Sequence, residues 1–66
     1  MRVLLNGEVH EIAQQTTVEE LLCSLHLERT PVAVERNTKI IPRAKYSTAV
    51  LQPDDEVEIV HFVGGG

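Results

Sequence analysis

The chain has 66 residues, a length that suits a single domain. A domain of this size buries only about 60% of the surface that its unfolded chain exposes, so its core is small and leaves little room for a deep catalytic pocket. Ten acidic and six basic residues give a formal net charge of −4. This charge argues against a nucleic acid or an anionic membrane as the main partner.

Hydrophobic residues make up 42% of the sequence, a share typical of folded globular proteins. The single cysteine, Cys23, excludes an internal disulfide framework and a multi-cysteine zinc site. No apolar run approaches the roughly 20 residues of a membrane span, and the first residues lack the pattern of a signal peptide. These features predict a soluble cytoplasmic protein with neither a membrane nor a nucleic-acid partner.

The first predicted element is a β-hairpin that turns at Asn6-Gly7. This dipeptide favours a type I′ turn, because both central residues of that turn need a positive φ. A two-residue turn places Val3 opposite His10. Val3 and Leu5 then share one face of the hairpin, and Leu4 lies on the other.

A helix is predicted from residue 18 to about residue 26. Thr17 and Glu20 have the spacing of a capping box, in which each side chain accepts a hydrogen bond from the backbone N–H of the other residue. The apolar residues that follow recur on one helical face: Val18, Leu21, Leu22 and Leu25. Pro31 limits any extension of this helix.

The second half of the chain predicts short strands and turns. Strands are expected over residues 32–35, 39–41 and 56–63, with a turn at 36–38 and a helical turn around 44–46. One amphipathic helix covers only one face of a small mixed sheet, which is an α+β architecture. The economical packing places the first and last strands side by side and parallel in the centre, which is the β-grasp arrangement.

The chain closes with three glycines, Gly64, Gly65 and Gly66. Glycine contributes no side-chain packing and loses more backbone entropy on ordering than any other residue. We therefore predict a folded domain over residues 1–63 and a flexible tail over residues 64–66. Composition alone leaves two interpretations open: a frayed end or linker, or a segment that threads into a narrow channel of a partner.

Several short motifs occur in an order and at spacings that are specific when taken together. They are residues 3–7, 17–22, 32–37, 41–43 and 51–59, followed by Phe62-Val63-Gly64-Gly65-Gly66. With these motifs, nearly the whole chain resembles the ThiS family, the ubiquitin-like sulfur carriers of thiamine biosynthesis. Two departures are visible: Tyr46 stands where the family often has Trp, and residues 53–55 replace a turn that usually contains Gly.

The resemblance implies that the protein is a carrier and a co-substrate, not an enzyme. A ThiF-like adenylyltransferase, which itself holds ATP and Mg²⁺, would join the carboxylate of Gly66 to AMP. A persulfide sulfur donor would then convert it to a thiocarboxylate, and a ThiG-like thiazole synthase would receive the sulfur. Gly64 and Gly65 would thread the tail into the partner. No cofactor bound to the carrier is implied.

An apolar patch for partner docking is expected on the sheet face opposite the helix. Leu4, Val60 and Phe62 are its candidate residues, since exposed contiguous apolar surface often marks an interface. A second packed layer, or isolated exposed apolar residues, is the alternative. The acidic run at residues 54–58 is interpreted as a solvated turn and strand face.

Other reactive side chains show no arrangement for chemistry. Cys23 is interpreted as incidental and not as a sulfur relay. The three histidines are scattered without ligand spacing, so no metal site is predicted. The basic residues of the middle third fit partner contact or solvation: Arg36, Lys39, Arg43 and Lys45.

Two alternative functions stay open at this point. A MoaD-like carrier for molybdopterin would use the same chemistry with a different recipient, although such chains tend to be longer. A ubiquitin-like binding module would act through its folded surface, and its tail would carry no sulfur.

Overall fold

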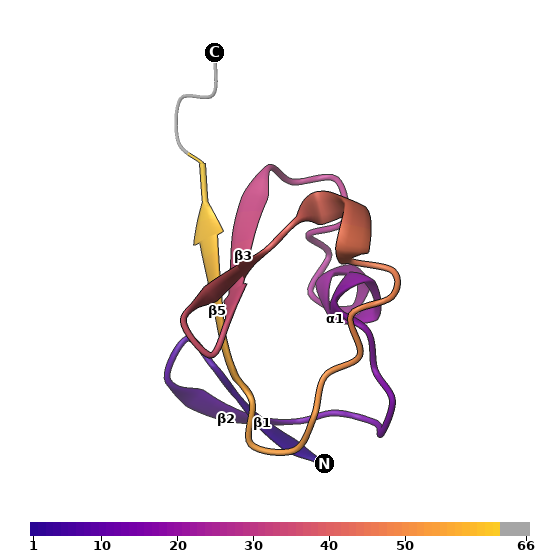
Figure 1. Cartoon of the computed structure of the whole chain (residues 1–66), viewed down its shortest axis with the longest axis vertical. Coiled ribbons are helices and arrows are strands. Elements are labelled where there is room, and N and C mark those ends of the chain that lie inside the picture. Colours follow the sequence, from indigo (N-terminus) through magenta and orange to yellow (C-terminus); the bar gives the residue numbers. More distant parts are fainter. Residues whose placement is uncertain (63–66) are drawn as a thin grey trace.

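The computed structural model describes residues 1–62, which form a five-stranded mixed sheet with one α-helix packed across one face (Figure 1). The strand order is β2-β1-β5-β3-β4. The first and last strands lie side by side and parallel in the middle of the sheet. This arrangement confirms the predicted α+β class and the β-grasp.

The elements have the following bounds. The strands are β1 (Arg2–Leu5), β2 (Glu8–Glu11), β3 (Val32–Arg36), β4 (Lys39–Ile41) and β5 (Glu56–His61). The helices are α1 (Val18–Ser24) and the short 3₁₀ helix η1 (Arg43–Lys45). None of the helices in residues 1–62 is long and apolar enough to cross a lipid bilayer. The predicted boundary after residue 63 and the glycine tail at 64–66 lie outside the described residues.

The hairpin has the predicted turn and register. Asn6 has φ of 50° and Gly7 has φ of 83°, so both central residues take the positive values that a type I′ turn requires. Val3 is paired with His10 in the β1–β2 ladder. Val3 and Leu5 are buried, whereas Leu4 on the other face is only half-buried.

The core lies between the sheet and α1. Alternate residues of the central strands point toward the helix, as the two-residue period of a strand dictates. The buried apolar residues of the sheet and of the helix are Val3, Leu5, Val32, Val34, Ile41, Val57, Ile59, Val18, Leu21 and Leu22. Leu51 closes the core from the loop before β5. Full burial of each such side chain stabilises the fold by about 1.5–3 kcal/mol.

Helix α1 begins as predicted but ends earlier. The Thr17 hydroxyl accepts a hydrogen bond from the Glu20 N–H at 3.1 Å, and the Glu20 carboxylate accepts one from the Thr17 N–H at 2.9 Å. The predicted end at about residue 26 is wrong: the helix stops at Ser24, with Leu25 as its C-cap. His26 has φ of 60°, a left-handed conformation that no helical residue adopts.

The residues after α1 form a Schellman motif. The His26 N–H donates to the Cys23 carbonyl at 3.0 Å, and the Leu27 N–H donates to the Leu22 carbonyl at 2.8 Å. The left-handed position of this motif is usually glycine, because a Cβ there is strained. Here it is an exposed histidine, so the strain is not offset by side-chain burial.

We therefore predict that His26→Gly stabilises the protein by about 1 kcal/mol, because it removes the Cβ from a left-handed residue. Urea unfolding followed by circular dichroism measures this difference. His26→Ala is the matched control: it removes the same ring but keeps the Cβ, so it should bring no gain. Equal stability of the two variants would contradict the assignment of strain to His26.

Candidate functional site

Strand β5 leads directly to the region of the predicted glycine tail. It pairs with β1 on one side and with β3 on the other, so it lies in the centre of the sheet. Its last residue, His61, is paired with Val32 of β3. The Phe62 N–H then donates to the Pro31 carbonyl at 3.1 Å. The last described residue is thus still tied to the folded body.

The main-chain pairing between β1 and β5 covers only two pairs of residues. Its Cα partners are Leu4 with Glu56 and Leu5 with Val57. The Leu4 N–H donates to the Asp55 carbonyl, and the Asn6 N–H donates to the Val57 carbonyl, both at 2.9 Å. Beyond this point β1 has ended and the chain turns away into the hairpin.

The side chain of Asn6 continues this pairing toward the end of β5. Its Oδ1 accepts a hydrogen bond from the Ile59 N–H at 2.8 Å, and its Nδ2 donates to the Ile59 carbonyl at 3.3 Å. The carboxamide therefore takes the place of a peptide group of a neighbouring strand. We call this pair of bonds the Asn6 clamp. The sequence indicated the turn at Asn6 but not the hydrogen bonds of its side chain, because their partner, Ile59, lies 53 positions away in the chain.

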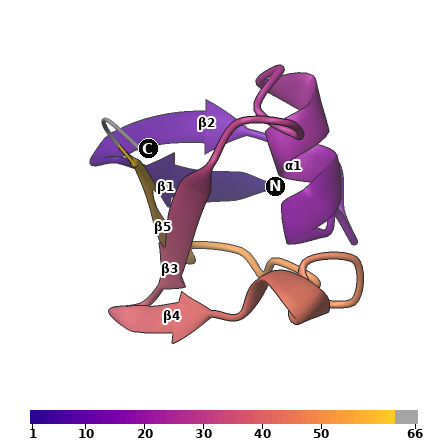
Figure 2. The ribbon, with the colours of Figure 1, turned by 90° about the horizontal axis from the view of Figure 1, so that it is seen from above.

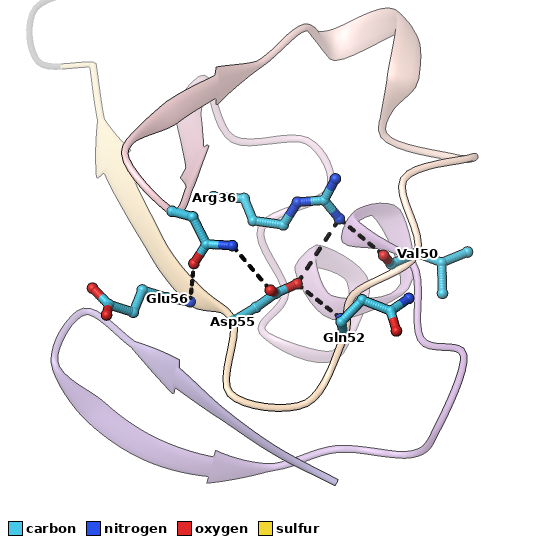
Figure 3. A network of polar contacts seen from close by, with 6 residues as sticks. Arg36, Val50, Gln52, Asp55 and Glu56 are labelled. Carbon is cyan, nitrogen blue, oxygen red and sulfur yellow. Dashed lines mark hydrogen bonds and ion pairs between the residues drawn. The ribbon is translucent and has the colours of Figure 1, made fainter.

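Asp55 holds the other end of β5 (Figure 3). It is buried, with 8% of its surface exposed. Its Oδ2 accepts a hydrogen bond from the Gln52 N–H at 2.8 Å, and its Oδ1 accepts one from Asn37 Nδ2 at 3.0 Å. Asn37 Oδ1 in turn accepts a hydrogen bond from the Glu56 N–H at 2.9 Å. These bonds fix the turn that feeds into β5.

Arg36 completes the same network. Its Nη1 donates to the Val50 carbonyl at 2.9 Å and lies 3.9 Å from Asp55 Oδ2. The interpretation of residues 54–58 as a solvated acidic run is therefore wrong for Asp55. The other acidic residues of the run, Asp54, Glu56 and Glu58, are exposed.

The candidate docking residues lie on the sheet face opposite the helix, but they do not form one patch. Val60 is 54% exposed and Phe62 is 57% exposed, at the end of β5. Leu4 is half-buried and stands beside Glu56 at the start of β5. The exposed Glu58 lies on the same face between these two positions. The register of β1 against β5 therefore contradicts the expectation that the three residues form one continuous patch. Docking of a partner at these residues stays a prediction.

Cys23 is exposed on α1. It lines a hollow of about 250 Å³ together with Glu19, Glu28 and Arg43. Within residues 1–62, no three histidine, cysteine or carboxylate side chains are grouped so that they could hold a metal ion.

Comparison with known proteins gives the family. Residues 3–66 match the ThiS family. The chain belongs to this family. A crystal structure of a thiamine biosynthesis protein, ThiS, from Geobacter metallireducens superposes with a TM-score of 0.86 at 30% identity, and the match covers the whole of both chains. The β-grasp described above is therefore the fold of this ThiS protein as well.

Two kinds of relatives have sequences similar to this chain. The sulfur carrier protein ThiS of Bacillus subtilis is 46% identical over 63 residues, which cover 94% of this chain and 96% of that protein. A thiazole synthase of Magnetococcus marinus is 48% identical over all 66 residues. The chain spans only 20% of the length of that thiazole synthase.

We predict that Asn6→Gly loosens the end of β5 while preserving the turn, since glycine accepts a positive φ without a side chain. Loss of the two bonds of the Asn6 clamp should lower the free energy of unfolding by about 1–2 kcal/mol. It should also speed hydrogen exchange of the Ile59 amide in NMR spectra. Glu8→Gln, at the exposed residue that follows the turn, should leave the protection of this amide unchanged. Unaltered exchange at Ile59 in Asn6→Gly would contradict the clamp.

Proposed function

We propose that this chain is a sulfur carrier that supplies sulfur for thiazole formation in thiamine biosynthesis, and that it acts as a co-substrate. The observation that carries this proposal is the match to the ThiS family over residues 3–66, which includes the three glycines. The likeness to the B. subtilis sulfur carrier over nearly the full length of both proteins supports it. These matches favour the thiamine branch over a MoaD-like role.

The proposed chemistry takes place at the carboxylate of Gly66. A carboxylate is a poor electrophile because its charge is delocalised and oxide is a poor leaving group. In the proposal, the carboxylate attacks the α-phosphate of ATP on a ThiF-like enzyme that also holds Mg²⁺, and pyrophosphate leaves. The terminal sulfur of a persulfide donor then attacks the acyl carbon, and AMP leaves. A second thiol cleaves the sulfur–sulfur bond, and a thiocarboxylate remains on Gly66.

The described residues of this chain would present the C-terminal glycines to the partner enzyme. The Asn6 clamp and the Asp55 network hold β5 at both ends, so the segment before the glycines starts from a rigid strand. Gly64 and Gly65 lack a Cβ, which suits passage through a narrow channel in a partner. Val60 and Phe62, both exposed, are the proposed contacts next to the mouth of that channel.

A thiazole synthase is the proposed recipient of the sulfur. The support for this step is the 48% identity to the thiazole synthase of M. marinus and the 41% identity to that of Paramagnetospirillum magneticum. In each case a sequence like this chain makes up 20% of a longer protein of that name. The presence of a sequence like this chain within a thiazole synthase supports a direct transfer of sulfur from the carrier to such an enzyme.

The proposal predicts a change in intact mass. Incubation with the ThiF-like enzyme of the same organism, Mg-ATP, a persulfide donor and a thiol that cleaves the acyl disulfide should raise the mass by the difference between sulfur and oxygen. A variant with one alanine added after Gly66 should show no gain, because its terminal carboxylate is displaced from the position that the enzyme activates. Mass spectrometry of the intact proteins measures the mass of both samples before and after incubation.

Two controls make this experiment decisive. An authentic ThiS protein loaded in parallel shows that the enzyme is active. Omission of ATP should abolish the mass gain, because sulfur cannot displace oxide from an unactivated carboxylate. If the authentic carrier is loaded and this chain is not, or if the alanine-extended variant is loaded equally well, the carrier proposal is wrong.

A further inference from the structure

The charges of this chain are divided between two parts of the sequence. Residues 36–53 contain four basic residues and no acidic one, a net charge of +4. The rest of the chain contains two basic and ten acidic residues, a net charge of −8. An acidic protein therefore has one continuous basic segment, and the proposed sulfur chemistry makes no use of it.

The fold places this basic segment along one edge of the sheet. The segment forms β4, η1 and the loop that leads toward β5. Figure 2 shows β4 at the edge opposite β2, with η1 next to it. The far edge, β2, carries the exposed Glu8 and Glu11. The two edges of the sheet thus differ in charge.

An open hollow of about 670 Å³ lies between β4 and the loop at residues 48–49. Three cations line it, Arg36, Lys39 and Lys45, and no acidic residue does. Ile41, Pro42 and Ala49 supply apolar surface between them. We call this feature the basic hollow.

The two lysines of the basic hollow are available to a partner. Arg36 is partly neutralised, because it lies 3.9 Å from Asp55 Oδ2 and donates to the Val50 carbonyl. Lys39 and Lys45 are exposed, and within residues 1–62 neither lies within 4.0 Å of a carboxylate. Pro42, which also lines the hollow, is exposed as well. Unpaired cations beside exposed apolar surface are complementary to a ligand that carries both carboxylates and apolar groups.

We propose that the basic hollow docks an acidic segment of a partner protein, with carboxylates on Lys39 and Lys45 and an apolar side chain against Pro42 and Ala49. A nucleic acid fits less well, because the net charge of −8 on the rest of the chain repels a long polyanion. The aromatic residue next to Lys45 in the sequence, Tyr46, is half-buried and offers little surface for base stacking. Addition of a partner strand to β4 also fits less well, since the lysine and the proline at its two ends oppose edge pairing.

The basic hollow is separate from the region of the proposed reaction. It lies on β4, whereas the glycines follow β5, and β3 stands between these two strands. A partner segment in the hollow therefore leaves the end of β5 uncovered. The inference does not depend on sulfur transfer, and the alanine-extended variant serves equally well for its test.

The test is an NMR titration of the ¹⁵N-labelled protein with two short capped peptides. One peptide alternates glutamate with valine, and the other alternates glutamine with valine. The acidic peptide should shift the amides of residues 39–49, and the glutamine peptide should not. Binding should weaken toward about 1 M salt, where the Debye length falls to about 3 Å.

Charge reversals at matched positions locate the site. Lys45→Glu should weaken binding of the acidic peptide about fivefold, as expected for one attraction turned into a repulsion at an exposed position. Arg29→Glu changes the net charge by the same amount at an exposed residue outside the hollow, and should leave the affinity nearly unchanged. Overlay of the two variant spectra with that of the parent protein verifies the fold.

Three results would overturn the proposal. The first is equal shifts by the glutamate and glutamine peptides, or no shift by either. The second is equal weakening by Lys45→Glu and Arg29→Glu, which would indicate net charge alone. The third is tighter binding of oligothymidylate than of the acidic peptide at the same residues, which would favour a nucleic-acid ligand.

Discussion

The parallel pairing of β1 with β5 is the constraint on which the rest of this structure depends. It joins segments from the two ends of the described chain, yet it includes only two pairs of facing residues. Side chains supply what the short main-chain ladder lacks: Asn6 bonds to both peptide groups of Ile59, and the buried Asp55 with Asn37 orders the entry to β5. Because each of these groups is a hydrogen-bonding partner for backbone that would otherwise be unpaired, β5 is held on its β1 side from Glu56 to Ile59, and β3 pairs with it as far as His61.

This constraint explains how a chain with so small a core can serve a reaction. In the proposal, activation of the carboxylate and delivery of sulfur take place on partner proteins, so the folded domain has to be recognised by them. The body contributes position: a rigid strand, two exposed apolar residues at the end of it, and a basic edge that faces away from the acidic one. Separate surfaces of this kind allow a small protein to be recognised by one part while another part reacts.

Sequence analysis predicted the features that depend on neighbours in the chain and missed those that depend on distant residues. The type I′ turn at Asn6-Gly7 and the capping box of Thr17 and Glu20 are decided by neighbours in the chain, and both were predicted correctly. The buried Asp55 and the partner of the Asn6 carboxamide were missed, because their contacts come from residues that are brought close only by folding. The end of α1 was also misplaced, since a histidine occupies a left-handed position for which glycine is the usual signal.

By itself the sequence determined the order of the elements, the face of each that is buried, the family and the glycine-rich end at which chemistry is proposed. These properties are carried by local hydrophobic periodicity, turn chemistry and motif order. Only the tertiary structure decided that Leu4 stands apart from Val60 and Phe62, that Asn6 holds Ile59, and that Lys39 and Lys45 line one hollow. The physical reason is that strand register and the approach of distant segments arise from packing of the whole sheet against α1, which no single stretch of sequence specifies.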